Sequence, residues 1–257
     1  MPNDASRLVG LALGFLLVGA RVTGAFYFVP FPGVEQANRL VKALLIFSIT
    51  ASLFPFWPAL DPNQPVMGLI VTGMLKEAGV GLCLGLVISL AVECFSFCFH
   101  LVGLQAGYTY ASTIDPTSTA DVTVLESLGH LAAGLLFFST GLHRSVIQAF
   151  AASLQAHPAG TWNLGPNVIE PVIRLFQVML STGLRLALPV LASMTMIDLA
   201  LALIGRVSSH LQLIFLAFPV KMLASLLMIG WILIVLPSIF DELSLRVLSE
   251  VRRLIGA

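Results

Sequence analysis

Few side chains of this 257-residue chain could do chemistry, and their spacing forms no catalytic set. The histidines show no ligand spacing, and no G-x-S-x-G, H-E-x-x-H or Walker A motif occurs. Asp115 and Asp121 could form a carboxylate pair, but no basic or histidine residue lies close to them in the sequence. Roles in a turn and a helix cap account for both aspartates. We therefore expect no enzymatic activity and no cofactor.

The three cysteines also lack the partners that a metal site or a disulfide framework needs. Cys83, Cys94 and Cys98 all lie in apolar runs, and Cys94 and Cys98 share a helical face at i, i+4. No acidic or histidine ligand stands at a suitable spacing, and an odd number of cysteines outside loops argues against disulfides. We interpret all three as packing residues and predict no metal site.

A polar stretch, AGYTYASTIDPTSTADVTVLES, interrupts the apolar sequence at residues 106–127. It is rich in Ser and Thr and is longer than a connection between two helices requires. Non-helical backbone is excluded from lipid unless protein buries it or water reaches it. The stretch is therefore expected either to lie at an aqueous end as an ordinary exposed loop or to line a cavity.

The composition indicates a chain that is surrounded by lipid or by other subunits. Hydrophobic residues make up 58% and charged residues 10% of the sequence, and the mean hydropathy is +0.97. Soluble domains have about 25% charged residues. The formal net charge is zero, so the sequence does not favour a nucleic-acid partner.

The apolar runs predict an all-α, membrane-associated bundle of broken helices and hairpins in a single domain, 1–257. The runs lie at about 8–29, 40–60, 66–105, 124–156, 171–205 and 211–240, and a span needs about 20 residues. The run 66–105 is therefore either a bent hairpin or a helix that leaves the hydrocarbon. Pro189, Pro219 and Pro237 predict kinks or breaks. We expect a retained first helix at the N-terminus and an amphipathic helix at about 241–255.

Several ionisable residues lie in or beside the apolar runs. We expect them to be buried away from lipid and to face one another, partner subunits or water, since an isolated charge in lipid is costly. They act either as paired contacts between helices or as part of a transport path or a wet surface between subunits. The residues are Glu77, Glu93, Arg185, Asp198, Arg206 and Lys221. Small residues at i, i+4 spacing, Gly81 with Gly85 and Gly103 with Gly107, predict close packing of helix backbones.

The central segment HLVGLQAGYTYASTIDPTSTADVTVL resembles the centre of the FliR/SctT family of type III secretion proteins. The shared residues are Gly103, Leu104, Gln105, Gly107, Ala111, Asp115 and Pro116. The resemblance extends over nearly the whole chain, through Arg21 and Pro30 near the start and through DLALALIGRVSSHLQLIFLAFPVKM at 198–222. One departure is Ser209-His210, where the family often has Pro-Gln.

The resemblance implies a subunit of the flagellar export gate in the bacterial inner membrane and the basal body. The implied partners are FliP, FliQ and FlhB, together with membrane lipid and the unfolded flagellar proteins that pass through the channel. A central loop at about 106–123 would help to plug the closed channel, and Gln105, Gly107, Gly81 and Gly85 would pack closely near the pore. The implied plug residues are Tyr110, Ser112, Thr113, Ile114, Asp115, Pro116, Thr117, Ser118, Thr119 and Asp121.

A second hypothesis is a small secondary transporter with a site between broken helices. Glu77, Glu93 and Arg206 would then be its coupling residues. That class predicts inverted internal repeats, and the two halves of the sequence show no clear self-similarity. The residues alone do not distinguish a flagellar from a virulence secretion system.

Overall fold

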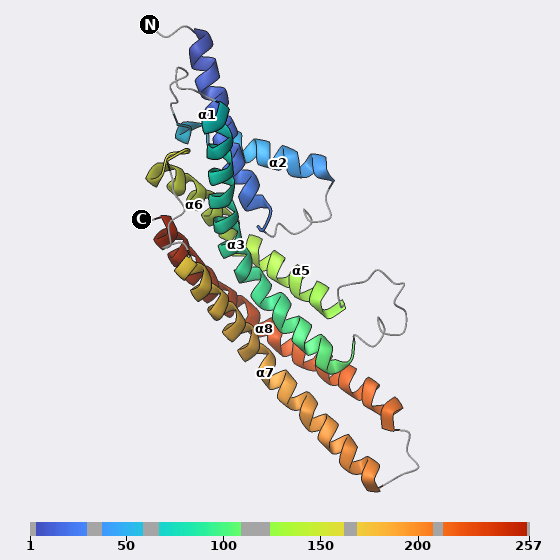
Figure 1. Ribbon diagram of the computed structural model, residues 1–257. Coiled ribbons are helices and arrows are strands. Elements are labelled where there is room, and N and C mark those ends of the chain that lie inside the picture. Colours follow the sequence, from blue (N-terminus) through green and yellow to red (C-terminus); the bar gives the residue numbers. More distant parts are fainter. Residues whose placement is uncertain are drawn as a thin grey trace. The chain divides into compact units, whose positions relative to one another are not determined.

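The computed structural model describes residues 4–29, 38–58, 67–108, 124–161, 169–207 and 213–255, and these residues form helices and turns without a strand. The prediction of an all-α fold is confirmed. The elements drawn in Figure 1 are α1 Asp4–Phe26, α2 Arg39–Ser52, the 3-10 helix η1 Phe54–Phe56, α3 Met67–Ala106, α5 Val124–Ser139, α6 Leu142–Ala156, α7 Ile169–Val207 and α8 Leu213–Ile255.

Four of the described helices are long and apolar enough to cross a membrane. The candidate spans are Leu8–Phe26, Val71–Ala106, Ile169–Arg206 and Ala217–Ile255, and the broken pair α5 and α6 would add a fifth. Helix α3 is a single helix of 40 residues, so the reading of this run as a bent hairpin is wrong. At 1.5 Å per residue it is about 60 Å long, roughly twice the hydrocarbon thickness.

Of the kinks or breaks predicted at the internal prolines, the breaks do not occur in the described helices. Helix α7 continues through Pro189, and α8 continues through Pro219 and Pro237 to Ile255, so the amphipathic tail belongs to α8. A proline removes one N–H from the helix ladder, but a long apolar helix retains the remaining bonds and tolerates the loss. The break occurs instead at Gly141, between α5 and α6, where φ is +75°.

The described chain divides into two compact units, and each combines segments from distant parts of the sequence. Unit 1 comprises residues 1–91, 137–176 and 243–257, and unit 2 comprises residues 92–136 and 177–242. Helices α3, α7 and α8 each contribute one part to each unit. Because both units are discontinuous, neither corresponds to a continuous stretch that the sequence could have revealed.

In unit 1, α1 packs against α2, and η1 packs against α2 and α6. Figure 1 shows that the axis of α2 runs across the axis of α1. The Phe15 ring meets Phe47 and Trp57 edge to face, with ring centroids 5.4 Å apart in both pairs. The Trp57 indole N–H donates to the Thr50 carbonyl oxygen at 3.1 Å, so α2 and the chain after it form one packed corner.

Unit 1 also contains a backbone-to-backbone contact between α1 and the first half of α3. A Cβ atom on Gly81 would overlap the carbonyl oxygen of Arg21, and one on Gly85 would overlap that of Ala25. Gly24 of α1 lies equally close to the backbone of α3. The close packing predicted for Gly81 and Gly85 is therefore seen against α1, whereas its position relative to a pore stays a prediction.

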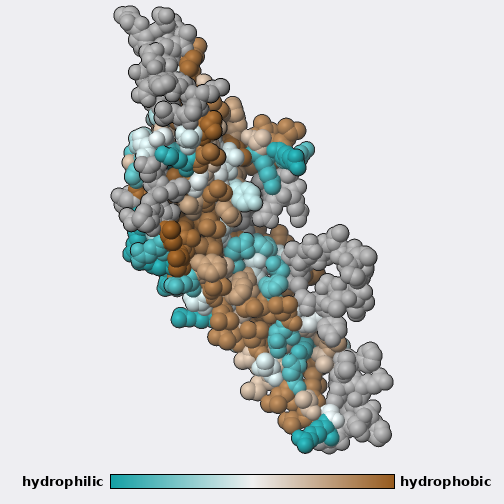
Figure 2. Space-filling view, viewed as in Figure 1, coloured by the Kyte–Doolittle hydropathy of each residue, from teal (hydrophilic) through white to brown (hydrophobic). Residues whose placement is uncertain are grey.

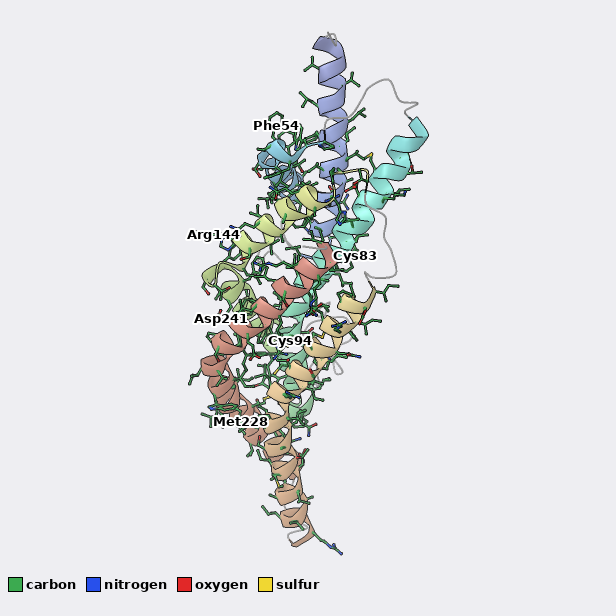
Figure 3. All side chains as sticks on the ribbon, turned by 90° about the vertical axis from the view of Figure 1, so that its left-hand side faces the viewer. Phe54, Cys83, Cys94, Arg144, Met228 and Asp241 are labelled. Atoms are coloured by element: carbon green, nitrogen blue, oxygen red, sulfur yellow. The ribbon has the colours of Figure 1, made fainter. Side chains whose placement is uncertain are left out.

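In unit 2, the second half of α3 lies in the interior between α5, α7 and α8. Gly183 of α7 sits against the carbonyl oxygen of Cys94, and Phe95 stacks on Phe240 of α8 at 5.6 Å between ring centroids. Ser193 of α7 donates to the sulfur of Met228 on α8 at 2.8 Å. Figure 1 and Figure 3 both show α7 and α8 side by side in this unit, and Figure 3 labels Cys94 and Met228 there.

Candidate functional site

The candidate site is the pair of helix ends in unit 2 from which the polar stretch departs and to which it returns. On the first side, α3 ends at Ala106 in a Schellman motif. The N–H of Tyr108 donates to the carbonyl oxygen of Gly103 at 3.1 Å, and Gly107 adopts φ +89°. A residue with a side chain is strained in this left-handed conformation, which explains a glycine at the point where the helix stops.

Residues of helix α8 contact the same turn. A Cβ atom on Gly107 would stand 3.1 Å from the ring of Phe218, so the ring reaches the turn only because no side chain intervenes. The Tyr108 hydroxyl donates to the carbonyl oxygen of Met222 at 3.5 Å, which is a long and weak bond. The turn at the end of α3 is thus tied to the first turns of α8.

Three polar side chains connect α3, α7 and α8 immediately before this turn. Lys221 of α8 forms an ion pair with Asp198 of α7 at 2.5 Å, and Lys221 also donates to the carbonyl oxygen of Gln105 at 3.4 Å. The Gln105 amide donates to the other oxygen of Asp198 at 3.4 Å. The Asp198 side chain is 44% exposed and that of Lys221 is 16% exposed, so water reaches the pair.

On the second side, the start of α5 is fastened to α3. His100 of α3 and Glu126 of α5 are joined at 2.9 Å, and Ser96 is joined to His130 at 2.8 Å. A Cβ atom on Gly129 would stand 3.0 Å from the side chain of Phe99, so the helices approach closely. The α3–α5 hairpin therefore anchors both ends of the intervening segment within unit 2.

The predicted plug residues lie between these anchors and outside the described residues. They are Tyr110, Ser112, Thr113, Ile114, Asp115, Pro116, Thr117, Ser118, Thr119 and Asp121. Two further predicted residues, Gln105 and Gly107, do lie in the described chain, and both take part in the anchor at the end of α3.

The six ionisable residues that were predicted to be buried occupy very different surroundings. Glu77 is fully buried in unit 1. Glu93, Asp198 and Lys221 are half-buried in unit 2. Arg185 and Arg206 are exposed on α7, so the chain by itself does not bury them as predicted. Their long side chains point away from its core. Burial of these two arginines against partner subunits stays a prediction.

Sequence reasoning missed the residue that is buried with Glu77. Arg21 of α1 has no exposed surface and pairs with Glu77 at 2.6 Å. A signal was present, because an arginine inside an apolar helix needs an acidic partner, and Glu77 is an acidic residue inside the apolar run 66–105. Their separation of 56 positions in the sequence concealed the contact.

The cysteines and histidines of the described chain form no metal site. Cys94 and Cys98 are buried free thiols, Cys83 is half-buried, and no group of three or more His, Cys, Asp or Glu residues gathers in the described ranges. The described part of the site therefore consists of helix ends joined by hydrogen bonds and ion pairs. These contacts hold the end of α3 and the start of α5 in place.

Apolar side chains remain at the surface on α7 and α8. Figure 2 shows hydrophobic residues at the surface over α7 in unit 2. Several are more than half exposed: Leu188, Met196, Leu199, Leu203, Leu223, Leu226, Leu227, Trp231 and Ile234. Monomeric soluble proteins rarely leave so much apolar surface uncovered, so lipid or other subunits must cover these faces.

Comparison with known sequences assigns the chain a family. The family model described as bacterial export proteins, family 1, matches residues 12–247. The flagellar biosynthetic protein FliR of Bacillus subtilis is 26% identical over 265 residues, which cover 98% of this chain and 99% of the relative. FliR of Escherichia coli is 26% identical over 203 residues, 79% of this chain and 77% of the relative. The surface presentation of antigens protein SpaR of Salmonella typhimurium is 24% identical over 237 residues, 91% of this chain and 87% of the relative.

Proposed function

Because the chain belongs to the bacterial export proteins, family 1, and is a membrane-integral component of a flagellar type III export apparatus, we propose that it forms part of the export channel. It assembles with FliP and FliQ, next to FlhB, in the bacterial inner membrane at the flagellar basal body. Unfolded flagellar proteins pass through the assembly. The chain contributes structure to the channel and performs no catalytic chemistry.

The exposed faces of α7 and α8 support assembly with other membrane subunits. These faces combine large apolar side chains with the exposed charges of Arg185 and Arg206. Lipid alone would leave such charges poorly solvated at membrane depth, whereas a protein neighbour can offer acceptors. We place FliP and FliQ on these faces and keep lipid for the parts that no subunit covers.

The polar loop at about 106–123 is proposed to help close the channel. The observation that carries this proposal is the anchoring of both its ends on one hairpin, by the Gly107 turn at the end of α3 and by the His100–Glu126 pair at the start of α5. A segment that is held at both ends can move aside for cargo and return to the same place. Its hydroxyl groups can form hydrogen bonds in several arrangements.

No observation favours the transporter hypothesis. Both carboxylate oxygens of Glu77 already accept hydrogen bonds within unit 1, from Arg21 and from the N–H of Gly160. Arg206 is exposed on α7. The surroundings of each residue, taken separately, lend no support to a coupling role.

Two measurements test the proposal. The tagged full chain, co-expressed with FliP and FliQ, is expected to purify as one stable complex. Deletion of residues 110–120 is expected to leave that complex intact and to raise the ion conductance of membranes that contain it. A complex that forms and conducts no more than the wild type removes the closing role, and a lone chain that binds a small solute removes the channel role.

A further inference from the structure

The interior of unit 1 holds a buried ion pair to which the proposed function gives no role. The Arg21 Nε donates to Glu77 Oε2 at 2.6 Å, and the two side chains are 0% and 1% exposed. Arg21 belongs to α1 and Glu77 to α3, where Gly24, Gly81 and Gly85 bring the two backbones together. The pair therefore lies inside the closest helix contact of this unit.

The second oxygen of Glu77 reaches a turn far away in the sequence. Oε1 of Glu77 accepts the N–H of Gly160 at 2.8 Å. Gly160 adopts φ +94° in the turn that follows α6, so this position requires glycine. One carboxylate thus connects α3 with α1 through one oxygen and with the turn through the other.

The remaining donors of Arg21 hold the start of the same turn. Nη1 donates to the Ser153 hydroxyl oxygen at 3.1 Å, and Nη2 donates to the carbonyl oxygen of His157 at 3.2 Å. Ser153 lies in the last turn of α6, and its hydroxyl donates onward to the Phe150 carbonyl oxygen at 2.8 Å. Nε2 of His157 lies 3.1 Å from the carbonyl oxygen of Ile255, so the end of α8 also contacts the turn.

We infer that the Arg21–Glu77 pair is a positioning device for the turn 157–161: Glu77 fixes the backbone of the turn, and Arg21 fixes Glu77. Buried ion pairs usually add little net stability compared with apolar residues of similar volume, because desolvation opposes their attraction. Their directional bonds, by contrast, allow only one arrangement. Three such bonds here reach the turn and the end of α6, and a fourth joins the two charged side chains.

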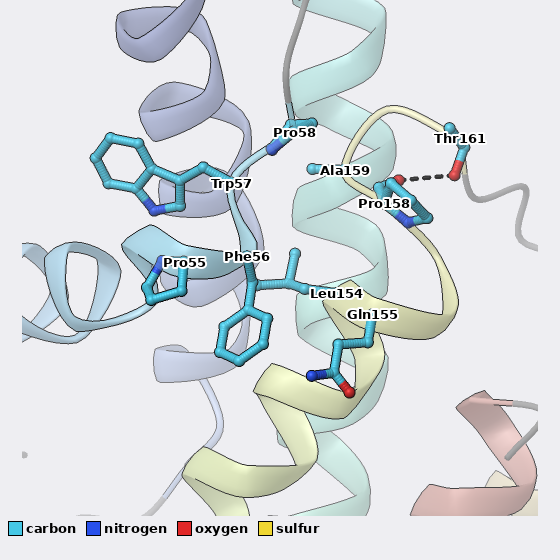
Figure 4. A pocket seen from close by; sticks show the side chains of 9 residues that line it. All are labelled: Pro55, Phe56, Trp57, Pro58, Leu154, Gln155, Pro158, Ala159 and Thr161. Atoms are coloured by element: carbon cyan, nitrogen blue, oxygen red, sulfur yellow. Dashed lines mark hydrogen bonds between the residues drawn. The ribbon is translucent and has the colours of Figure 1, made fainter.

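The turn in question forms one wall of a groove. Figure 4 shows Pro158, Ala159 and Thr161 on one side and the residues from Pro55 to Pro58 on the other. The groove has a volume of about 410 Å³, and the Thr161 hydroxyl closes the turn by donating to the Pro158 carbonyl oxygen at 2.7 Å. By holding the turn, the pair also determines the width of this groove. The inference concerns unit 1 alone and does not depend on the proposed export function.

The test separates positioning from stability in the full chain, purified in detergent. The double variant Arg21→Met/Glu77→Leu replaces the pair by apolar side chains of similar size and is expected to melt within a few degrees of the wild type, about 5 °C or less. The single variant Glu77→Leu leaves the arginine buried without its partner and is expected to melt about 10 °C lower. Hydrogen exchange, read by mass spectrometry on peptides that cover 157–161, then reports the turn itself.

In the double variant, the amides of the turn are expected to exchange about tenfold to a hundredfold faster, because Gly160 has lost its buried acceptor. Exchange in α2 and α5 is expected to match the wild type. Glu77→Gln is the second variant if the double variant does not fold. Its carboxamide has one acceptor oxygen, which the charged guanidinium of Arg21 takes in preference to the N–H of Gly160, so the turn is again expected to exchange faster. Ser153→Ala is the matched control, because it removes one bond of Arg21 and leaves Glu77 on Gly160. Wild-type protection of the turn in the double variant, or an equal acceleration along the whole chain, overturns the inference.

Discussion

The long apolar helices of this chain differ in how much of their surface the chain itself covers. The contact between α1 and α3 in unit 1 buries its helices, whereas the pair α7 and α8 leaves apolar faces uncovered. In its most apolar window, α3 is 72% buried by the chain's own residues, whereas α7 is 17% buried and α8 is 28% buried. In unit 1, glycines of α1 and α3 lie against the backbone of the other helix, and a fully buried ion pair finds its partners within the unit. Along α7 and α8, large apolar side chains are left uncovered.

The difference shows which parts of the molecule the chain completes by itself. A close contact between two helix backbones needs small residues and a matching surface, and α1 and α3 supply both in unit 1. The outer faces of α7 and α8 have no such partner within the described chain. We therefore expect changes in unit 1 to damage the chain itself, and changes on α7 and α8 to damage its assembly.

The largest effect is expected from Gly81→Ala. The added methyl group would overlap the carbonyl oxygen of Arg21, which belongs to helix backbone and cannot move aside. Overpacking of this kind costs about 3 kcal/mol of unfolding free energy, measured by thermal or denaturant unfolding in detergent. Gly230→Ala is the matched control, because a Cβ there meets nothing within 4 Å. Equal stability of the two variants would contradict the close contact.

The next effect is expected from Gly107→Ala in unit 2. The substitution strains a backbone with φ +89° and brings a methyl group to 3.1 Å from the Phe218 ring, with a combined cost of about 1–2 kcal/mol. Gly141→Ala carries the backbone strain alone, because nothing lies within 4 Å of its Cβ at φ +75°. The difference between the two unfolding free energies measures the ring contact. A bulkier residue at Gly107 is also expected to reduce motility, and normal motility would argue against a role for tight packing there.

A smaller effect is expected from Asp198→Asn. The ion pair with Lys221 is partly exposed, so its loss is expected to cost below about 1 kcal/mol and to cost less at high salt. A double-mutant cycle with Lys221→Met isolates the coupling between the two side chains. A coupling as large as that of the Arg21–Glu77 pair would show that water does not reach this part of unit 2.

The smallest effect on the chain itself is expected from Ile234→Asn on α8. Ile234 is 78% exposed, so the unfolding free energy in detergent is expected to change by less than about 0.5 kcal/mol. The yield of the complex with FliP and FliQ is expected to fall, because a polar amide replaces an apolar contact. Ile232→Asn is the comparison, since Ile232 is 1% exposed and its replacement is expected to lower the unfolding free energy clearly more than Ile234→Asn does. An unchanged yield with Ile234→Asn places the interface elsewhere.

Much of the fold and part of the site could be read from residue order. Apolar runs predicted the helices, since hydrophobicity over about 20 residues is a local property. The Gly81–Gly85 spacing predicted close packing but could not identify α1 as the partner, because spacing specifies a face and not its neighbour. The proline positions predicted kinks or breaks in α7 and α8, and neither helix is interrupted there, since the cost of one missing N–H depends on the rest of the helix.

The sequence by itself determined that the chain is helical, apolar and without a recognisable catalytic motif, because composition and periodicity act within single segments. Only the tertiary structure decided that Arg21 pairs with Glu77 and that Gly160 and Ser153 join them. It also decided that Asp198 and Lys221 stand beside the end of α3. Side chains tens of residues apart meet only after helices pack, and which helices pack depends on the complementary shape of whole faces.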